Sequence, residues 1–120
     1  MKTRIEALEK AYEEHRYYAE DLPMNRTLQA ACMTSLEAGN DYPDFSEVIW
    51  EEDIEQILKD CKTYGISEFT ISSNFSGLIK TIAAFEDLGA KMEGITRVNS
   101  RYADWSTGKH EIIPAIRMSI

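Results

Sequence analysis

The sequence is poor in the residues that build metal sites, disulfide scaffolds and glycine-rich loops. Its 120 residues include only 2 cysteines, 2 histidines, 3 prolines and 6 glycines. Cys32 and Cys61 form no CxxC pair, and His15 and His110 lie far apart in the sequence. Zinc sites need clustered ligands, so we expect no metal site and no cofactor. We interpret both cysteines as buried free thiols, because free cysteine packs as a small apolar side chain.

Long hydrophobic runs are also missing, which excludes several classes of protein. No apolar run is long enough to span a membrane, and residues 1–15 lack the apolar stretch of a secretion signal. We therefore expect a cytoplasmic protein with no membrane partner and no disulfide. Hydrophobic residues at 43% and charged residues at 28% are typical of a folded chain. The length suits one domain, with a helical hairpin in residues 1–40 and an α/β sheet unit in residues 45–120.

Basic residues are scarce in the first half of the chain. Residues 1–60 carry 15 Asp and Glu against 6 Lys and Arg, whereas residues 61–120 carry 6 against 7. The formal net charge of −8 is therefore concentrated in the N-terminal half. Such a half repels nucleic-acid phosphate and attracts basic surfaces. We expect no direct contact with nucleic acid, and a protein partner with a basic surface.

Apolar periodicity predicts two helices at the N-terminus. The first stripe recurs at steps of three and four and comprises Ile5, Leu8, Tyr12, His15 and Ala19. Thr3 and Glu6 have the spacing of a capping box, and the helix is expected to end near residue 21, before a proline. A second helix fits residues 23–38, with Gly39 as its stop. Small side chains on the second helix favour close packing, so we expect an antiparallel helical hairpin.

The C-terminal two-thirds alternate between strand and helix patterns. The acidic triplet of residues 51–53 begins a helix, where carboxylates favour the positive end of the helix dipole. Further patterns predict a strand, a helix, a strand and a final strand at residues 66–72, 75–88, 91–102 and 112–120. The short apolar run of residues 48–50 could form an edge strand, and the sequence leaves open whether it joins the sheet.

These elements predict an α+β fold. A strand–helix–strand unit favours a right-handed crossover with parallel pairing, so residues 66–72 and 91–102 are expected to be neighbours. The last two strands are joined by a short turn and predict an antiparallel hairpin. Pro114 indicates that the final strand has an edge at that position, since proline cannot donate to the ladder. The expected product is a small mixed sheet with helices packed on it.

One polar turn is the best candidate for a ligand site. In a parallel pair the carboxyl ends of both strands meet at one edge, where ligands favour the crevice. The residues expected at that edge are Ser72, Ser73, Asn74, Ser76, Asn99, Arg101, Tyr102, Asp104 and Trp105. A phosphate or carboxylate could bind free helix N–H groups there, with Arg101 as the counter-charge. The competing interpretation is that Ser73 or Asn74 only caps its own helix.

Catalytic motifs are missing from the sequence. The Ser76-Gly77 pair is not the G-x-S-x-G of a nucleophile elbow, and the turn lacks the glycines and lysine of a P-loop. His15 lies on the apolar stripe of the first helix, where a packed histidine is the ordinary outcome. Nothing in the spacing brings Asp104 and Glu111 together as a carboxylate pair. Enzymatic activity is therefore not expected.

Four stretches between about residues 45 and 120 read SEVIWEEDIEQIL, EFTISSNFSGL, VNSRYADWSTG and IPAIRMSI. Together they resemble small uncharacterised proteins of bacterial mobile elements, such as conjugative plasmids and phages. The resemblance carries over no catalytic residue and no known activity. It implies an accessory role, such as counter-defence or control of transfer.

Two hypotheses for function follow. The first is a non-catalytic interaction protein, such as an acidic inhibitor, that docks on a basic nucleic-acid-binding partner. Its candidate contacts are Glu9, Glu13, Glu14, Glu51, Glu52 and Asp53. The alternative is a small-ligand or phosphate-binding module that uses the Ser72–Ser76 turn and Arg101. A homodimer through Tyr12, Tyr17 and Tyr18 is compatible with either hypothesis.

Overall fold

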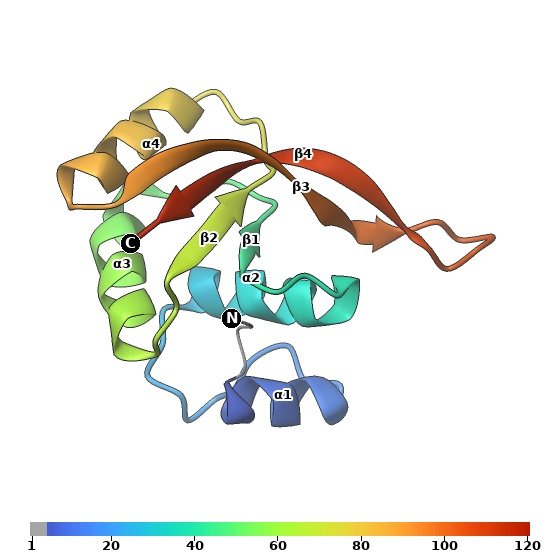
Figure 1. Ribbon diagram of the computed structural model, residues 1–120. Coiled ribbons are helices and arrows are strands. Elements are labelled where there is room, and N and C mark those ends of the chain that lie inside the picture. Colours follow the sequence, from blue (N-terminus) through green and yellow to red (C-terminus); the bar gives the residue numbers. More distant parts are fainter. Residues whose placement is uncertain (1–4) are drawn as a thin grey trace.

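The computed structural model describes residues 5–120, which form helices packed on a small mixed sheet (Figure 1). The helices are α1 (Glu6–Glu13), α2 (Arg26–Ala38), α3 (Ile54–Thr63) and α4 (Leu78–Asp87). The strands are β1 (Asp44–Phe45), β2 (Glu68–Ile71), β3 (Lys91–Ala103) and β4 (His110–Ser119). The predicted α+β class is confirmed. Thr3, of the predicted capping box, lies outside the described residues.

The sheet has the strand order β1-β2-β4-β3. The predicted hairpin of the last two strands is confirmed, because β4 pairs antiparallel with β3. The predicted pairing of residues 66–72 with 91–102 is wrong, because β4 lies between β2 and β3 and is antiparallel to both. In this register Met118 and Ile116 pair with Phe69 and Ile71, so a second apolar strand lies beside β2 in the core.

The core lies between the sheet and the helices. Phe69 of β2 is its centre, with its ring 5.4 Å from that of Phe45 and 5.0 Å from that of Phe85, which α4 contributes. The same buried cluster includes Leu8 of α1 and Leu28 of α2. The N-terminal helices therefore share one hydrophobic core with the sheet.

At Pro114, strand β4 pairs with β3 only. The Cα partner of Pro114 on β3 is Arg97, whereas β2 reaches only as far as Ile116. The side of β4 away from β3 is therefore open at Pro114, which is where a strand tolerates proline. The edge predicted at this proline is confirmed. Beyond it, β3 and β4 continue as a two-stranded arm that projects from the body (Figure 1).

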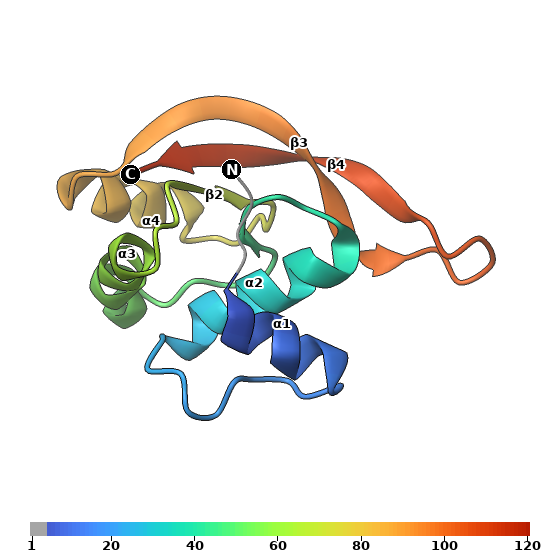
Figure 2. The same ribbon diagram turned by 60° about the horizontal axis from the view of Figure 1, so that its bottom comes forward.

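The first helix is shorter than the apolar stripe predicts. It ends at Glu13, and His15 adopts φ 57° in a turn closed by the Arg16 N–H donating to the Ala11 carbonyl. His15 is exposed, so its predicted packing on the stripe is wrong. Residues 14–25 return along the molecule, and Figures 1 and 2 show α1 and α2 running in the same direction. The expected antiparallel arrangement of these two contacting helices is therefore also wrong.

A buried glutamine holds the returning segment in place. The Gln29 side chain accepts from the Ala19 N–H at 3.0 Å and donates to the Leu22 and Met24 carbonyls at 3.2 and 3.0 Å. Because Gln29 is fully buried, these are the bonds that replace its lost hydration. They explain why residues 19–24 form an ordered loop instead of prolonging α1.

Two local predictions about the loops differ from the structure. Residues 48–50 form no strand, and the segment contributes only the two-residue β1 before it. Helix α4 begins at Leu78 with Gly77 as its N-cap and has no side-chain capping bond. The interpretation of Ser73 or Asn74 as a helix cap is therefore wrong. None of the helices in residues 5–120 has the length and apolar character needed to cross a membrane.

Candidate functional site

A buried aspartate joins the ends of the two parallel strands. Asp44 of β1 pairs with Thr70 of β2, and its carboxylate accepts 2.6 Å hydrogen bonds from the hydroxyls of Thr70 and Ser72. The Asp44 N–H in turn donates to Ser35 Oγ of α2 at 3.0 Å. Burial raises the pKa of Asp44, although the two hydroxyls act in the opposite direction. Ser72 is thus engaged by a carboxylate.

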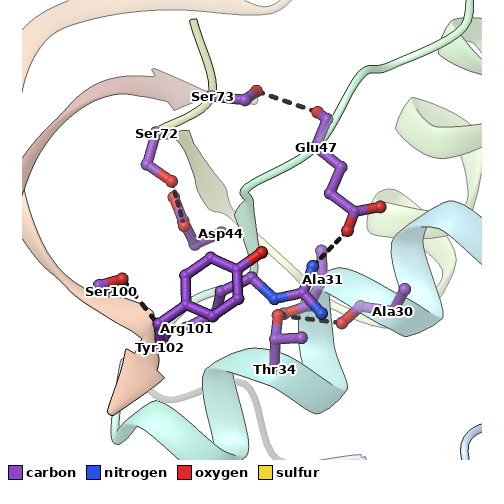
Figure 3. A network of polar contacts seen from close by, with 10 residues as sticks. All are labelled: Ala30, Ala31, Thr34, Asp44, Glu47, Ser72, Ser73, Ser100, Arg101 and Tyr102. Atoms are coloured by element: carbon purple, nitrogen blue, oxygen red, sulfur yellow. Dashed lines mark hydrogen bonds and ion pairs between the residues drawn. The ribbon is translucent and has the colours of Figure 1, made fainter. Parts of the chain in front are cut away.

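The next serine connects the same region to the arm. Ser73 Oγ donates to the Glu47 carbonyl at 2.9 Å, and the Glu47 carboxylate pairs with the guanidinium of Arg101 (Figure 3). Arg101 also lies over the Tyr102 ring, 5.2 Å from its centroid. The structure therefore brings Ser72, Ser73 and Arg101 into one network. An added anion would meet the carboxylates of Asp44 and Glu47 there, which disfavours a phosphate cradle.

The other residues predicted for the ligand site lie elsewhere. Asn99 exchanges backbone hydrogen bonds with the Asn40 side chain and donates to the Ala38 carbonyl. Asp104 accepts from the Ser106 hydroxyl and from the N–H groups of Ser106 and Thr107 at the tip of the arm, and these hydrogen bonds lower its pKa. The remaining four are exposed on the arm or in the loop before α4 and comprise Tyr102, Trp105, Asn74 and Ser76.

A groove of about 840 Å³ runs along one face of α2. Residues of successive α2 turns form its floor, namely Thr27, Ala30, Thr34 and Glu37. One wall comes from the end of α1 and the turn after it, including Tyr12 and Tyr17. The other wall comes from the segment after β1, including Trp50, together with Arg101. Its volume lies in the range of about 300–1,000 Å³ that is typical of ligand sites.

The unpaired charge of this groove is negative. Each of its arginines has a carboxylate partner, in the pairs Arg16–Glu14 at 2.8 Å, Arg26–Glu20 at 3.3 Å and Arg101–Glu47. Two groove acids, Glu13 and Glu37, are exposed and have no ion-pair partner within residues 5–120. The groove therefore combines exposed aromatic rings with two uncompensated carboxylates.

The six acidic residues predicted to contact a partner occupy different environments. Glu13 lines the groove, and Glu14 pairs with Arg16 beside it. Glu51 and Glu52 are exposed in the 3₁₀ turn next to Trp50. Asp53 accepts from the side chains of Asn25 and Thr27, which connects α2 to the start of α3. Glu9 is half-buried on α1.

Neither the cysteines nor the acidic residues form a reactive cluster in the described part of the chain. Cys32 and Cys61 are free and buried. Burial raises the pKa of both thiols, to about 12 for Cys61, whose neighbour Asp60 adds to the effect. The thiolate needed for nucleophilic chemistry is therefore disfavoured. Residues 5–120 contain no group of three or more His, Cys, Asp or Glu side chains that could hold a metal ion.

Sequence reasoning placed Glu13 and Arg101 in two separate sites, whereas both line the same groove. It missed Trp50, which it considered only as part of a possible edge strand, and it missed Glu37. Their sequence signal is weak, because the groove residues come from three segments, residues 12–18, 26–37 and 44–50, and from Arg101. A tryptophan beside an acidic triplet was the available indication.

Comparisons with known proteins identify a family for most of the chain. The sequence model of the Domain of unknown function (DUF7698) matches residues 27–120, which contain α2 except its first residue and every later element to β4. Neither a curated protein nor a solved structure matches. The match extends further towards the N-terminus than the resemblance over residues 45–120, and α1 with the loop after it lies outside it. The chain therefore belongs to the DUF7698 family of domains of unknown function.

Proposed function

We propose that this protein is a non-catalytic interaction protein whose groove along α2 docks on a basic segment of a partner protein. The observation that carries this proposal is a pair of carboxylates, Glu13 and Glu37, that have no ion-pair partner among residues 5–120, in a groove whose arginines are already paired. A basic segment would neutralise them, and complementary charge mainly increases the rate and specificity of association. Exposed Glu51 and Glu52 extend the negative surface past Trp50.

The partner class in this proposal is a nucleic-acid-binding protein of the cytoplasm. Such proteins carry lysine- and arginine-rich surfaces that bind phosphate, and an acidic protein can occupy the same surface. Residues 1–60 carry most of the negative charge of the chain. The resemblance to mobile-element proteins favours an inhibitor or control factor in that setting. Competition between DNA and this protein for one partner is the behaviour that the proposal requires.

The experiment uses a poly-lysine peptide as the probe, at about 0.15 M salt and at several-fold higher salt. We expect binding that weakens steeply with salt. The Glu13→Gln/Glu37→Gln variant should lose about two- to thirtyfold in affinity, because exposed ion pairs contribute about 0.2–1 kcal/mol each. The matched control, Glu55→Gln/Asp87→Asn, removes two exposed charges outside the groove and should bind like the wild type.

Equal losses for both double variants would show that only the net charge matters and would contradict a groove-specific contact. The alternative of a phosphate-binding module at Ser72–Ser76 and Arg101 makes a different prediction. Inorganic phosphate should then protect the protein against thermal unfolding, and Arg101→Gln should abolish that protection. Light scattering is run in parallel, because a homodimer through Tyr12, Tyr17 and Tyr18 would cover one groove wall.

A further inference from the structure

Three aromatic side chains of the groove, Tyr17, Tyr18 and Trp50, differ in whether a cation lies against the ring. Tyr18 already carries a cation, since the Arg26 guanidinium lies 4.6 Å from its ring centroid. Tyr17 and Trp50 carry none within residues 5–120, and they are 87% and 61% exposed. Large aromatic rings exposed to this degree beside a groove are typical of binding surfaces, where they act as anchors.

The unpartnered groups around these rings match the chemistry of arginine. A guanidinium is planar, is weakly hydrated and stacks on aromatic faces, and its fork of N–H groups fits a carboxylate. Glu13 lies on the same wall as Tyr17, and Glu37 lies on the groove floor. The arrangement of Arg101, between Tyr102 and the Glu47 carboxylate, shows this combination within the protein itself.

We infer that the groove recognises arginine side chains of the partner, in preference to lysine, by stacking them on Tyr17 and Trp50. This inference rests on the proposed function, and it names the residue type that the groove selects. Charge alone would not distinguish poly-arginine from poly-lysine of equal length. Stacking would distinguish the two peptides, because it depends on the planar guanidinium group rather than on the net charge.

The two tryptophans allow a direct test. Trp50 lines the groove, whereas Trp105 lies at the tip of the arm and is 97% exposed. Trp105→Phe leaves Trp50 as the only tryptophan, and Trp50→Phe leaves only Trp105. Each variant is titrated with poly-arginine and with poly-lysine while the tryptophan emission is recorded. We expect poly-arginine to change the emission of Trp50 and to leave that of Trp105 unchanged.

Affinities for the two peptides give the second readout. We expect poly-arginine to bind at least about threefold tighter than poly-lysine, and Tyr17→Leu or Trp50→Leu to remove about that factor for poly-arginine only. Equal affinities, unaffected by these variants but reduced by Glu13→Gln/Glu37→Gln, would overturn the arginine inference and leave the proposed function standing. Failure of both peptides to bind the wild type at low salt would overturn both.

Discussion

The carboxylate of Asp44 accepts a 2.6 Å hydrogen bond from the hydroxyl of Ser72. This bond connects the end of β2 to β1, at the start of the segment that leads to the groove. A hydroxyl donating to a buried carboxylate is a strong interaction, and Thr70 supplies a second one. The pair therefore fixes the strand end from which residues 45–50 start. The wall that carries Trp50 depends on this contact.

Burial of Asp44 predicts a specific dependence of stability on pH. Its pKa is raised in the folded state above the ordinary aspartate value of 3.8, so the unfolded chain ionises at lower pH than the folded protein. The contribution of Asp44 to the unfolding free energy is therefore complete below pH 3.8, and it is lost as pH rises through the pKa of the folded state. Compared with Asp44→Asn, the wild type should lose stability as pH increases from about 4. Urea unfolding of both proteins between pH 3 and pH 8 measures the difference, and a difference that grows in favour of the wild type contradicts this assignment.

Gln29 predicts how the returning segment can be loosened. Gln29→Leu keeps the approximate size of the side chain but leaves the Ala19 N–H and two carbonyls without their partner. We expect a loss of about 1–3 kcal/mol in unfolding free energy. Amide exchange should accelerate in residues 14–25 and stay unchanged in β2 and β4. Lys59→Leu, at an exposed position of α3 whose side chain makes no hydrogen bond or ion pair within residues 5–120, is the control and should have little effect. Unaltered exchange in residues 14–25 would refute the assigned role.

His15 predicts a stabilising substitution. Its φ of 57° is a left-handed conformation that costs a residue with a Cβ about 1–2 kcal/mol, whereas glycine adopts it freely. Part of this gain is offset by the greater chain entropy of glycine in the unfolded state. His15→Gly should therefore increase the unfolding free energy by about 0.5–1 kcal/mol. Lys10→Gly, inside α1, should instead lower it by about 1 kcal/mol. Thermal unfolding compares the two, and a destabilised His15→Gly variant would show that the turn is unstrained.

Phe69 is the core position at which we expect truncation of a side chain to lower the unfolding free energy most. It is fully buried, and its ring contacts those of Phe45 and Phe85 from two other elements. Phe69→Ala should cost about 3–5 kcal/mol, because the cavity lies between the sheet and α4. Phe69→Leu should retain most of the stability. Urea unfolding measures both, and a loss below about 1 kcal/mol for Phe69→Ala would contradict the central position of this ring.

Local patterns in the sequence predicted those features that depend on neighbouring residues. Gly39 ends α2 with a positive φ of 81°, and Pro114 lies at an open side of β4, because both effects act through the residue's own backbone. The hairpin of β3 and β4 follows from a short turn. The position of β4 beside β2 could not be deduced, since it depends on Ile116 and Met118 meeting a strand more than forty residues earlier.

The groove depends on still less local information. Its walls form because residues 14–25 return along α2, and the buried bonds of Gln29 that cause this return leave no periodic signal. The apolar stripe through His15 and Ala19 favours a continuous helix instead. The predicted proximity of Arg101 to the Ser72–Ser73 turn is seen in the structure, but its carboxylate partner, Glu47, comes from a loop that no motif marks.

The central claim is that a basic segment binds in the groove along α2, and chemical-shift mapping tests it most directly. Isotope-labelled protein is titrated with the poly-arginine peptide, and each backbone amide is followed. The account predicts shifts in residues 12–18, 26–37 and 44–50, with none at the tip of the arm near Trp105. Shifts confined to the arm, or spread evenly over all exposed acidic residues, would contradict it.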